Sequence, residues 1–234
     1  MLAPRGFADS VMDFTLHERD AVMAPTWALL AYSSLGRPRD SILALRQRVN
    51  AAIDNYVAPE RRELARAATL DEQAVEAFPE LGLSPRHRSG TDRNYLLRMQ
   101  FKYARGDRAG ARAGLESLWV SRKGWPAWAV SIDRTYLEAA LYTDLGDTAA
   151  AVQVLDAALN APLNLDTYAL AWITLPGNLV RAMALRARLA AAAGDRPAAT
   201  IWSNAVLILW SNADAEFQSL VDSMRALAVT RPPH

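Results

Sequence analysis

The chain has 234 residues, of which 51% are hydrophobic and 22% charged, and it contains no cysteine. This composition is typical of a folded domain. The net charge is only +1, without the excess of basic residues that nucleic-acid-binding domains carry, so we expect no nucleic-acid partner. The absence of cysteine excludes disulfides, thiolate metal sites and cysteine nucleophiles. No run reaches the roughly 20 apolar residues needed to span a bilayer, and the first residues lack the apolar segment of a signal peptide. We therefore expect a cytoplasmic protein without a membrane span.

The first predicted helical hairpin covers residues 21–54. A helix up to Leu35 is followed by Gly36 and by Pro38, a residue that suits the first turn of the next helix. Ile42, Leu45 and Val49 then recur at helical spacing. The more charged segment that follows ends in a predicted loop at residues 81–92.

The next two hairpins, residues 93–120 and 134–160, are built around one turn sequence. Apolar residues recur every three or four positions on both sides of Gly106-Asp107 and of Gly146-Asp147, which predicts one apolar stripe on each helix. Glycine can take the left-handed conformation that ends a helix, and aspartate can cap the helix that follows. We therefore predict two hairpins, joined by a connector at residues 121–128.

A fourth hairpin, residues 179–210, has the same turn at Gly194-Asp195. Before it, residues 161–178 read as a long connector that Pro176-Gly177 ends, so the next helix is expected to begin at Leu179. A final helix at residues 213–228 has one apolar and one polar face, as expected of a helix that covers the end of a repeat array.

The repeated turns carry a family resemblance. Aligned on Gly106, Gly146 and Gly194, each copy continues with aspartate and has alanine five residues after the glycine (Ala111, Ala151 and Ala199). With Tyr142, Leu155 and Ala158-Leu159, this series resembles the tetratricopeptide repeat family. The early-helix tryptophan and Leu-Gly pair of that family are missing, and the glycine spacings of 70, 40 and 48 residues, counted from Gly36, exceed its period of about 34. The last hundred residues are similar to the repeat region that follows the catalytic domain of many bacterial serine/threonine protein kinases.

The resemblance implies an all-α, right-handed solenoid of helical hairpins with a C-terminal capping helix, forming a single domain over residues 1–234. It also implies a non-catalytic scaffold, part of a signalling kinase system, whose first helices line a concave groove for a protein or peptide partner. By register, the groove residues would be Arg93, Gln100, Tyr103, Asp133, Tyr136, Thr143, Asp144, Arg181 and Arg188. Arginine and tyrosine are enriched at binding hot spots; the alternative is an ordinary solvated helix face.

Catalytic motifs are missing from the sequence: it has no Gly-x-Ser-x-Gly elbow, no Gly-rich phosphate loop and no kinase catalytic set. The three histidines, His17, His87 and His234, have no partners at metal-ligand spacing, so we expect no metal and no cofactor.

The tryptophans and the overall sequence leave several alternatives open. Four tryptophans on predicted helices are expected to be core residues: Trp27, Trp119, Trp202 and Trp210. The connector tryptophans Trp125, Trp128 and Trp172 instead support a competing hypothesis, a small-molecule sensor or enzyme with an aromatic pocket. Two further interpretations are the repeat region of a transcriptional regulator and one part of a longer protein, and the oligomeric state stays open.

Overall fold

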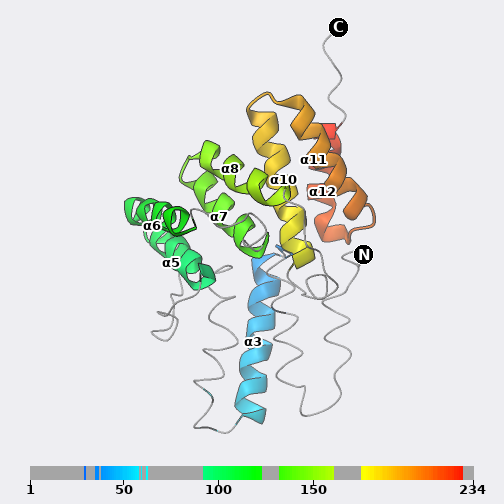
Figure 1. Cartoon of the computed structure of the whole chain (residues 1–234). Helices are drawn as coiled ribbons and strands as arrows, with labels where there is room; N and C mark the ends of the chain where they lie inside the picture. The colour runs from blue at the N-terminus through cyan, green and yellow to red at the C-terminus, as the bar shows by residue number, and fades with distance from the viewer. Residues whose placement is uncertain are drawn as a thin grey trace. The chain divides into compact units, whose positions relative to one another are not determined.

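The computed structural model describes residues 29, 35–36, 38–57, 59, 62, 92–122, 132–160 and 175–228. Every element with defined bounds in these ranges is a helix, and no strand occurs there, which confirms the all-α prediction for this part of the chain. The helices are α3 (Arg39–Tyr56), α5 (Asp92–Ala104), α6 (Arg108–Ser121), α7 (Ile132–Asp144), α8 (Thr148–Leu159), α10 (Leu175–Ala192), α11 (Arg196–Leu209), the short 3-10 helix η5 (Ala215–Phe217) and α12 (Gln218–Ala228) (Figure 1). Among the described helices, none combines the length and the apolar character that crossing a membrane requires.

Helix α3 begins directly after Pro38, as the sequence predicts. Pro38 has φ −52° and lies just outside the helix, where its missing N–H costs no hydrogen bond. The buried residues recur at spacings of three and four along one face: Ile42, Leu45, Val49 and Ile53. The preceding turn residue Gly36 has φ +72°, a conformation that glycine tolerates best. The helix predicted before it lies almost wholly outside the described residues.

The helices belong to two compact units, with the division between Trp125 and Pro126. In the first unit, α5 contacts α6 through a close approach of Gly114 to Met99. A Cβ added at Gly114 would lie 1.7 Å from the Met99 sulfur, so the two helices can pack this tightly only with glycine there. Leu96 and Leu115 are fully buried in the same unit.

In the second unit, α10 (yellow in Figure 1) is the central helix. It contacts α7 and α8 on the chain's N-terminal side and α11 and α12 on its C-terminal side. Within each hairpin the two helices also contact each other, α7 with α8 and α10 with α11, and α11 contacts α12. Each hairpin of this unit is therefore packed against the next one along the chain.

Small residues make this packing close. The residues at the helix contacts include five buried alanines: Ala139, Ala151, Ala182, Ala187 and Ala199. Leu155 on α8 and Met224 on α12 are fully buried and supply larger apolar groups. The alanine found five residues after each turn glycine is thus a core residue, since Ala111, Ala151 and Ala199 are at most 2% exposed.

The Gly-Asp turns have the geometry that the sequence predicts. Gly146 has φ +83°, its N–H donates to the Thr143 carbonyl (2.9 Å), and the Asp147 N–H donates to the Tyr142 carbonyl (2.8 Å). This is the Schellman pattern that ends a helix. Asp147 Oδ1 then accepts from the Ala150 N–H at 3.1 Å and caps α8. The same bonds form at Gly106-Asp107 and at Gly194-Asp195.

One dipeptide therefore ends one helix and starts the next. The glycine supplies the left-handed residue, and the aspartate contributes its N–H to the helix before it and its carboxylate to the helix after it.

Two predictions about local structure are wrong. Helix α10 begins at Leu175 instead of Leu179, and Pro176 and Gly177 belong to its first turn; proline is compatible with that turn because the N–H groups there have no intrahelical acceptor. Trp119 is 42% exposed and is no core residue, whereas Trp210 is 2% exposed and its ring centroid lies 4.9 Å from that of Phe217. Trp202 is half-buried, and Trp27 lies outside the described residues.

Candidate interaction surface

The best-defined part of the predicted groove is a contact between α7 and α10, the first helices of successive hairpins. The Arg181 guanidinium carbon lies 4.1 Å from the centroid of the Tyr136 ring. Such a cation–π contact is worth on the order of 0.5–1 kcal/mol at an exposed site and more when desolvated. Both side chains are half-buried, so the pair is partly accessible and already ordered.

Further predicted residues lie on the same two helices. Asp144 at the end of α7 and Arg188 on α10 are exposed, while Thr143 is half-buried and donates its hydroxyl to the Ala139 carbonyl at 2.8 Å. The Thr143 hydroxyl is thus satisfied within its own helix. Arg181 and Arg188 are seven residues apart, which places them on one face of α10, about 10 Å apart along its axis.

Two predicted residues, Gln100 and Tyr103, lie on α5, in the other unit. Both are half-buried, and the Arg108 guanidinium carbon lies 5.2 Å from the Tyr103 ring centroid. The side chains of Arg93 and Asp133 lie outside the described part of the structure. The structure therefore brings Tyr136 and Arg181 of the predicted set together but does not place the α7 and α10 members relative to those on α5.

One polar contact in the second unit was missed by sequence reasoning. Arg186 on α10 donates from Nε to Asp156 Oδ1 (2.6 Å) and from Nη2 to Asp156 Oδ2 (3.2 Å) on α8. The Arg186 side chain is only 10% exposed, so this two-bond pair joins the two hairpins within their packed interface. The sequence signal was an arginine inside the apolar stripe of α10.

Glu138 on α7 is a second buried charged residue, with no exposed surface. It belongs to the same helix face as Thr135, which is also fully buried. The second unit therefore buries charged side chains on both α7 and α10, and the Arg186–Asp156 pair gives the contact of α8 with α10 a polar component.

The described ranges also bear on the metal-site and aromatic-pocket alternatives. They contain no group of three or more histidine, cysteine, aspartate or glutamate side chains placed to hold a metal ion. The three histidines and the connector tryptophans Trp125, Trp128 and Trp172 fall outside these ranges, so the aromatic-pocket hypothesis stays a prediction.

No protein-family model, no curated protein and no solved structure matches the chain.

Proposed function

We propose that this chain is a non-catalytic scaffold of the tetratricopeptide type, which binds an extended segment of a protein partner on the face of α7 and α10. The observation that carries the proposal is the contact of Arg181 with Tyr136. The sequence register alone predicts that both residues belong to one binding face. Their contact joins α7 and α10, the first helices of two successive hairpins.

The packing order of the second unit supports a solenoid. Helix α10 contacts both helices of the preceding hairpin as well as α11 and α12. Stacked hairpins that touch only their neighbours in sequence are the defining property of helical repeat proteins. Helix α12 buries Val221 and Met224 and exposes Asp222 and Arg225, as a capping helix should.

The chemistry of the face suits peptide recognition. A guanidinium held against a ring loses little conformational freedom when a partner binds, and arginine forks can hold carboxylate or carbonyl groups of the partner. Arg188, exposed on the same face, adds a second such group. Tyr136 supplies rigid apolar area at low entropic cost.

A displayed library of random twelve-residue peptides, selected against the purified full chain, tests the proposal. Binding of selected peptides is then measured on Tyr136→Ala/Arg188→Glu and on the control Arg196→Glu, which changes an exposed arginine of α11. We expect the first variant to bind at least about tenfold more weakly, the scale of a hot-spot loss, and the control to bind like the wild type.

The proposal is wrong if selected peptides bind the wild type and the Tyr136→Ala/Arg188→Glu variant equally well. Circular dichroism spectra that match between the variants and the wild type show that the comparison concerns binding and not folding. Side-chain truncation at a half-buried surface residue should leave the helix content unchanged.

A further inference from the structure

The α5–α6 hairpin concentrates positive charge. Residues 92–122 hold seven basic and three acidic residues, a net charge of +4, whereas the other 203 residues hold 19 basic and 22 acidic residues, a net charge of −3. One of the three acidic side chains, Asp107, is engaged in capping α6 through the Gly110 N–H. The α5–α6 hairpin is thus basic although the net charge of the whole chain is close to zero.

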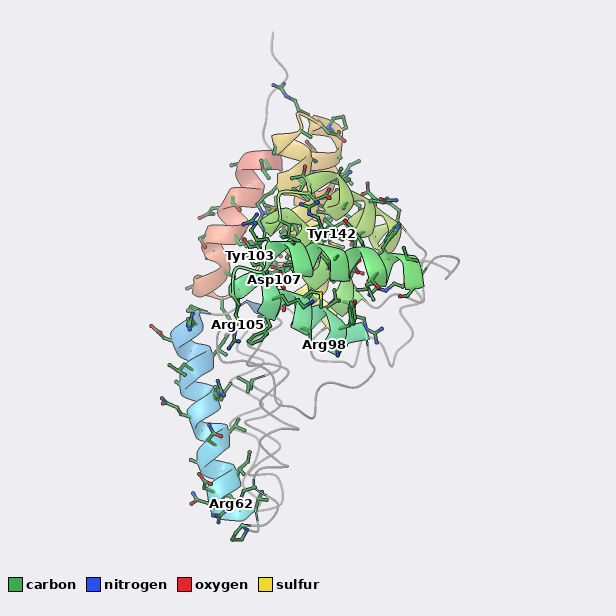
Figure 2. All side chains as sticks on the ribbon, turned by 90° about the vertical axis from the view of Figure 1, so that its left-hand side faces the viewer. Arg62, Arg98, Tyr103, Arg105, Asp107 and Tyr142 are labelled. Carbon is green, nitrogen blue, oxygen red and sulfur yellow. The ribbon has the colours of Figure 1, made fainter. Side chains whose placement is uncertain are left out.

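The charges form a row, which we call the basic row: Arg98 and Lys102 on α5, and Arg105 directly after its last residue. Spacings of four and three place these residues on one face of the helix. Lys102 and Arg105 are exposed, and Arg98 is half-buried. Arg98 and Arg105 are labelled on this hairpin in Figure 2.

Aromatic rings hold the arginines of the hairpin. The guanidinium carbon of Arg98 lies 5.1 Å from the Tyr95 ring centroid, that of Arg105 lies 4.4 Å from Phe101, and that of Arg108 lies 5.2 Å from Tyr103. Contact with a ring restricts the side chain before any partner arrives, which lowers the entropy cost of binding. Three such contacts in one hairpin indicate a prearranged basic surface.

The residues at the same positions of the α7 hairpin differ from the basic row in burial. Counted from the turn glycine, Arg98, Lys102 and Arg105 correspond to Glu138, Tyr142 and Leu145. Glu138 and Tyr142 on α7 and Leu145 directly after it are all buried, the most exposed at 7%. The row that is buried in and beside α7 is basic in and beside α5, where Lys102 and Arg105 are exposed, so covering it with an apolar helix would bury charge at a high cost in free energy.

We propose that the basic row of α5 docks an acidic, aspartate- or glutamate-rich segment of a protein partner. Arg98 and Lys102 are about 6 Å apart along the helix axis, close to the about 7 Å between alternate residues of an extended peptide, whose side chains point to the same side. This surface differs from the α7–α10 face and lies in the other unit.

An acidic protein segment fits better than nucleic acid. The rest of the chain has a net charge of −3 and so adds no attraction for a nucleic acid, whose bases would also compete with the arginines for the rings. A short acidic segment needs only the row itself.

The test measures binding of a fluorescein-labelled peptide, three repeats of Glu-Ser-Glu-Ala, to the full chain by fluorescence anisotropy at low salt. The row variant is Lys102→Glu/Arg105→Glu, and the control is Arg48→Glu/Arg196→Glu on α3 and α11. All four residues are exposed, and both variants change the net charge by the same amount. We expect the row variant to bind about tenfold more weakly, since two attractive contacts become repulsive, and the control to stay within about twofold of wild type.

Three results would overturn the proposal: equal weakening by both variants, which indicates unspecific charge attraction; a Kd weaker than about 1 mM for the wild type; or tighter binding of a twelve-nucleotide oligouridine than of the peptide. If the row variant loses helix content, Lys102→Gln/Arg105→Gln replaces it. The variant Tyr136→Ala/Arg188→Glu should bind the acidic peptide like the wild type. Its binding therefore distinguishes a failure of the proposal for the basic row from a failure of the proposal for the α7–α10 face.

Discussion

Replacing Gly146 with alanine isolates the backbone cost of a Gly-Asp turn. Gly146 has φ +83°, and an added Cβ would meet no atom within 4 Å, so the penalty comes from backbone conformation alone. A left-handed L-residue costs about 1–2 kcal/mol, and about 0.4–1 kcal/mol returns because alanine restricts the unfolded chain. We expect a net loss of about 1 kcal/mol, or a fall of about 2–4 °C in Tm for a chain of this size.

Urea denaturation followed by far-UV circular dichroism measures this loss, with an unchanged m-value showing that only stability has changed. Gly146→Asn should cost less than Gly146→Ala, because asparagine visits the left-handed region more readily. Equal stability of the alanine and asparagine variants would refute the conformational explanation.

Gly114→Ala provides a contrast with a different cause. Here the added Cβ would lie 1.7 Å from the Met99 sulfur, so we expect overpacking to cost about 1–3 kcal/mol. In a Met99→Ala background the clash disappears, and the same substitution should become neutral or stabilising because alanine favours helix. A full penalty in both backgrounds would mean that Met99 is not the obstacle.

Two further predictions concern the second unit and use the same urea assay. Leu155→Ala removes a fully buried side chain and should cost about 2–5 kcal/mol, whereas Leu43→Ala, at a residue 40% exposed on α3, should cost less than about 1 kcal/mol. Similar losses in the two variants would contradict the core assignment. Asp156→Ala leaves the Arg186 guanidinium buried without this partner and should cost about 3 kcal/mol; a loss below about 1 kcal/mol would show that solvent reaches the arginine.

The turns were predictable from sequence because their determinants are local. Each Gly-Asp pair specifies both a left-handed residue and a cap within about six residues, so no knowledge of the remaining fold is needed. The apolar stripes of α7, α8 and α11 follow from spacing in the same way. The predicted helix ends beside each Gly-Asp turn therefore lie close to the observed ones.

The errors arose where a local signal has two meanings. Pro176 can end one segment or begin the next helix, and in the sequence it looks the same in both roles. Trp119 lies near the end of α6, where the apolar residues exceed what the neighbouring helix covers, so its 42% exposure depends on packing that periodicity does not encode.

The candidate site was predictable only in part. Register correctly places Tyr136 on α7 and Arg181 on α10, but their contact depends on how one hairpin packs against the next. The Arg186–Asp156 pair joins residues 30 positions apart, and nothing in either helix alone selects that partner. The basic row was overlooked because the net charge of +1 for the chain averages a positive hairpin with a negative remainder.

A charged residue recurs eight positions before the turn glycine in three first helices: Arg98, Glu138 and Arg186. The last two are buried, and burying charge costs several kcal/mol unless partners compensate it. Alanine-rich helix faces can pack together in many ways, whereas Arg186 meets Asp156 only if α10 lies against α8 in one alignment. We therefore infer that the Arg186–Asp156 pair selects the alignment of these two hairpins, while the small alanines allow the helices to pack closely. The Asp156→Ala variant tests this inference as well: selection of alignment requires that native-state hydrogen exchange speed up in α8 and α10 together, and faster exchange in α8 alone would refute it.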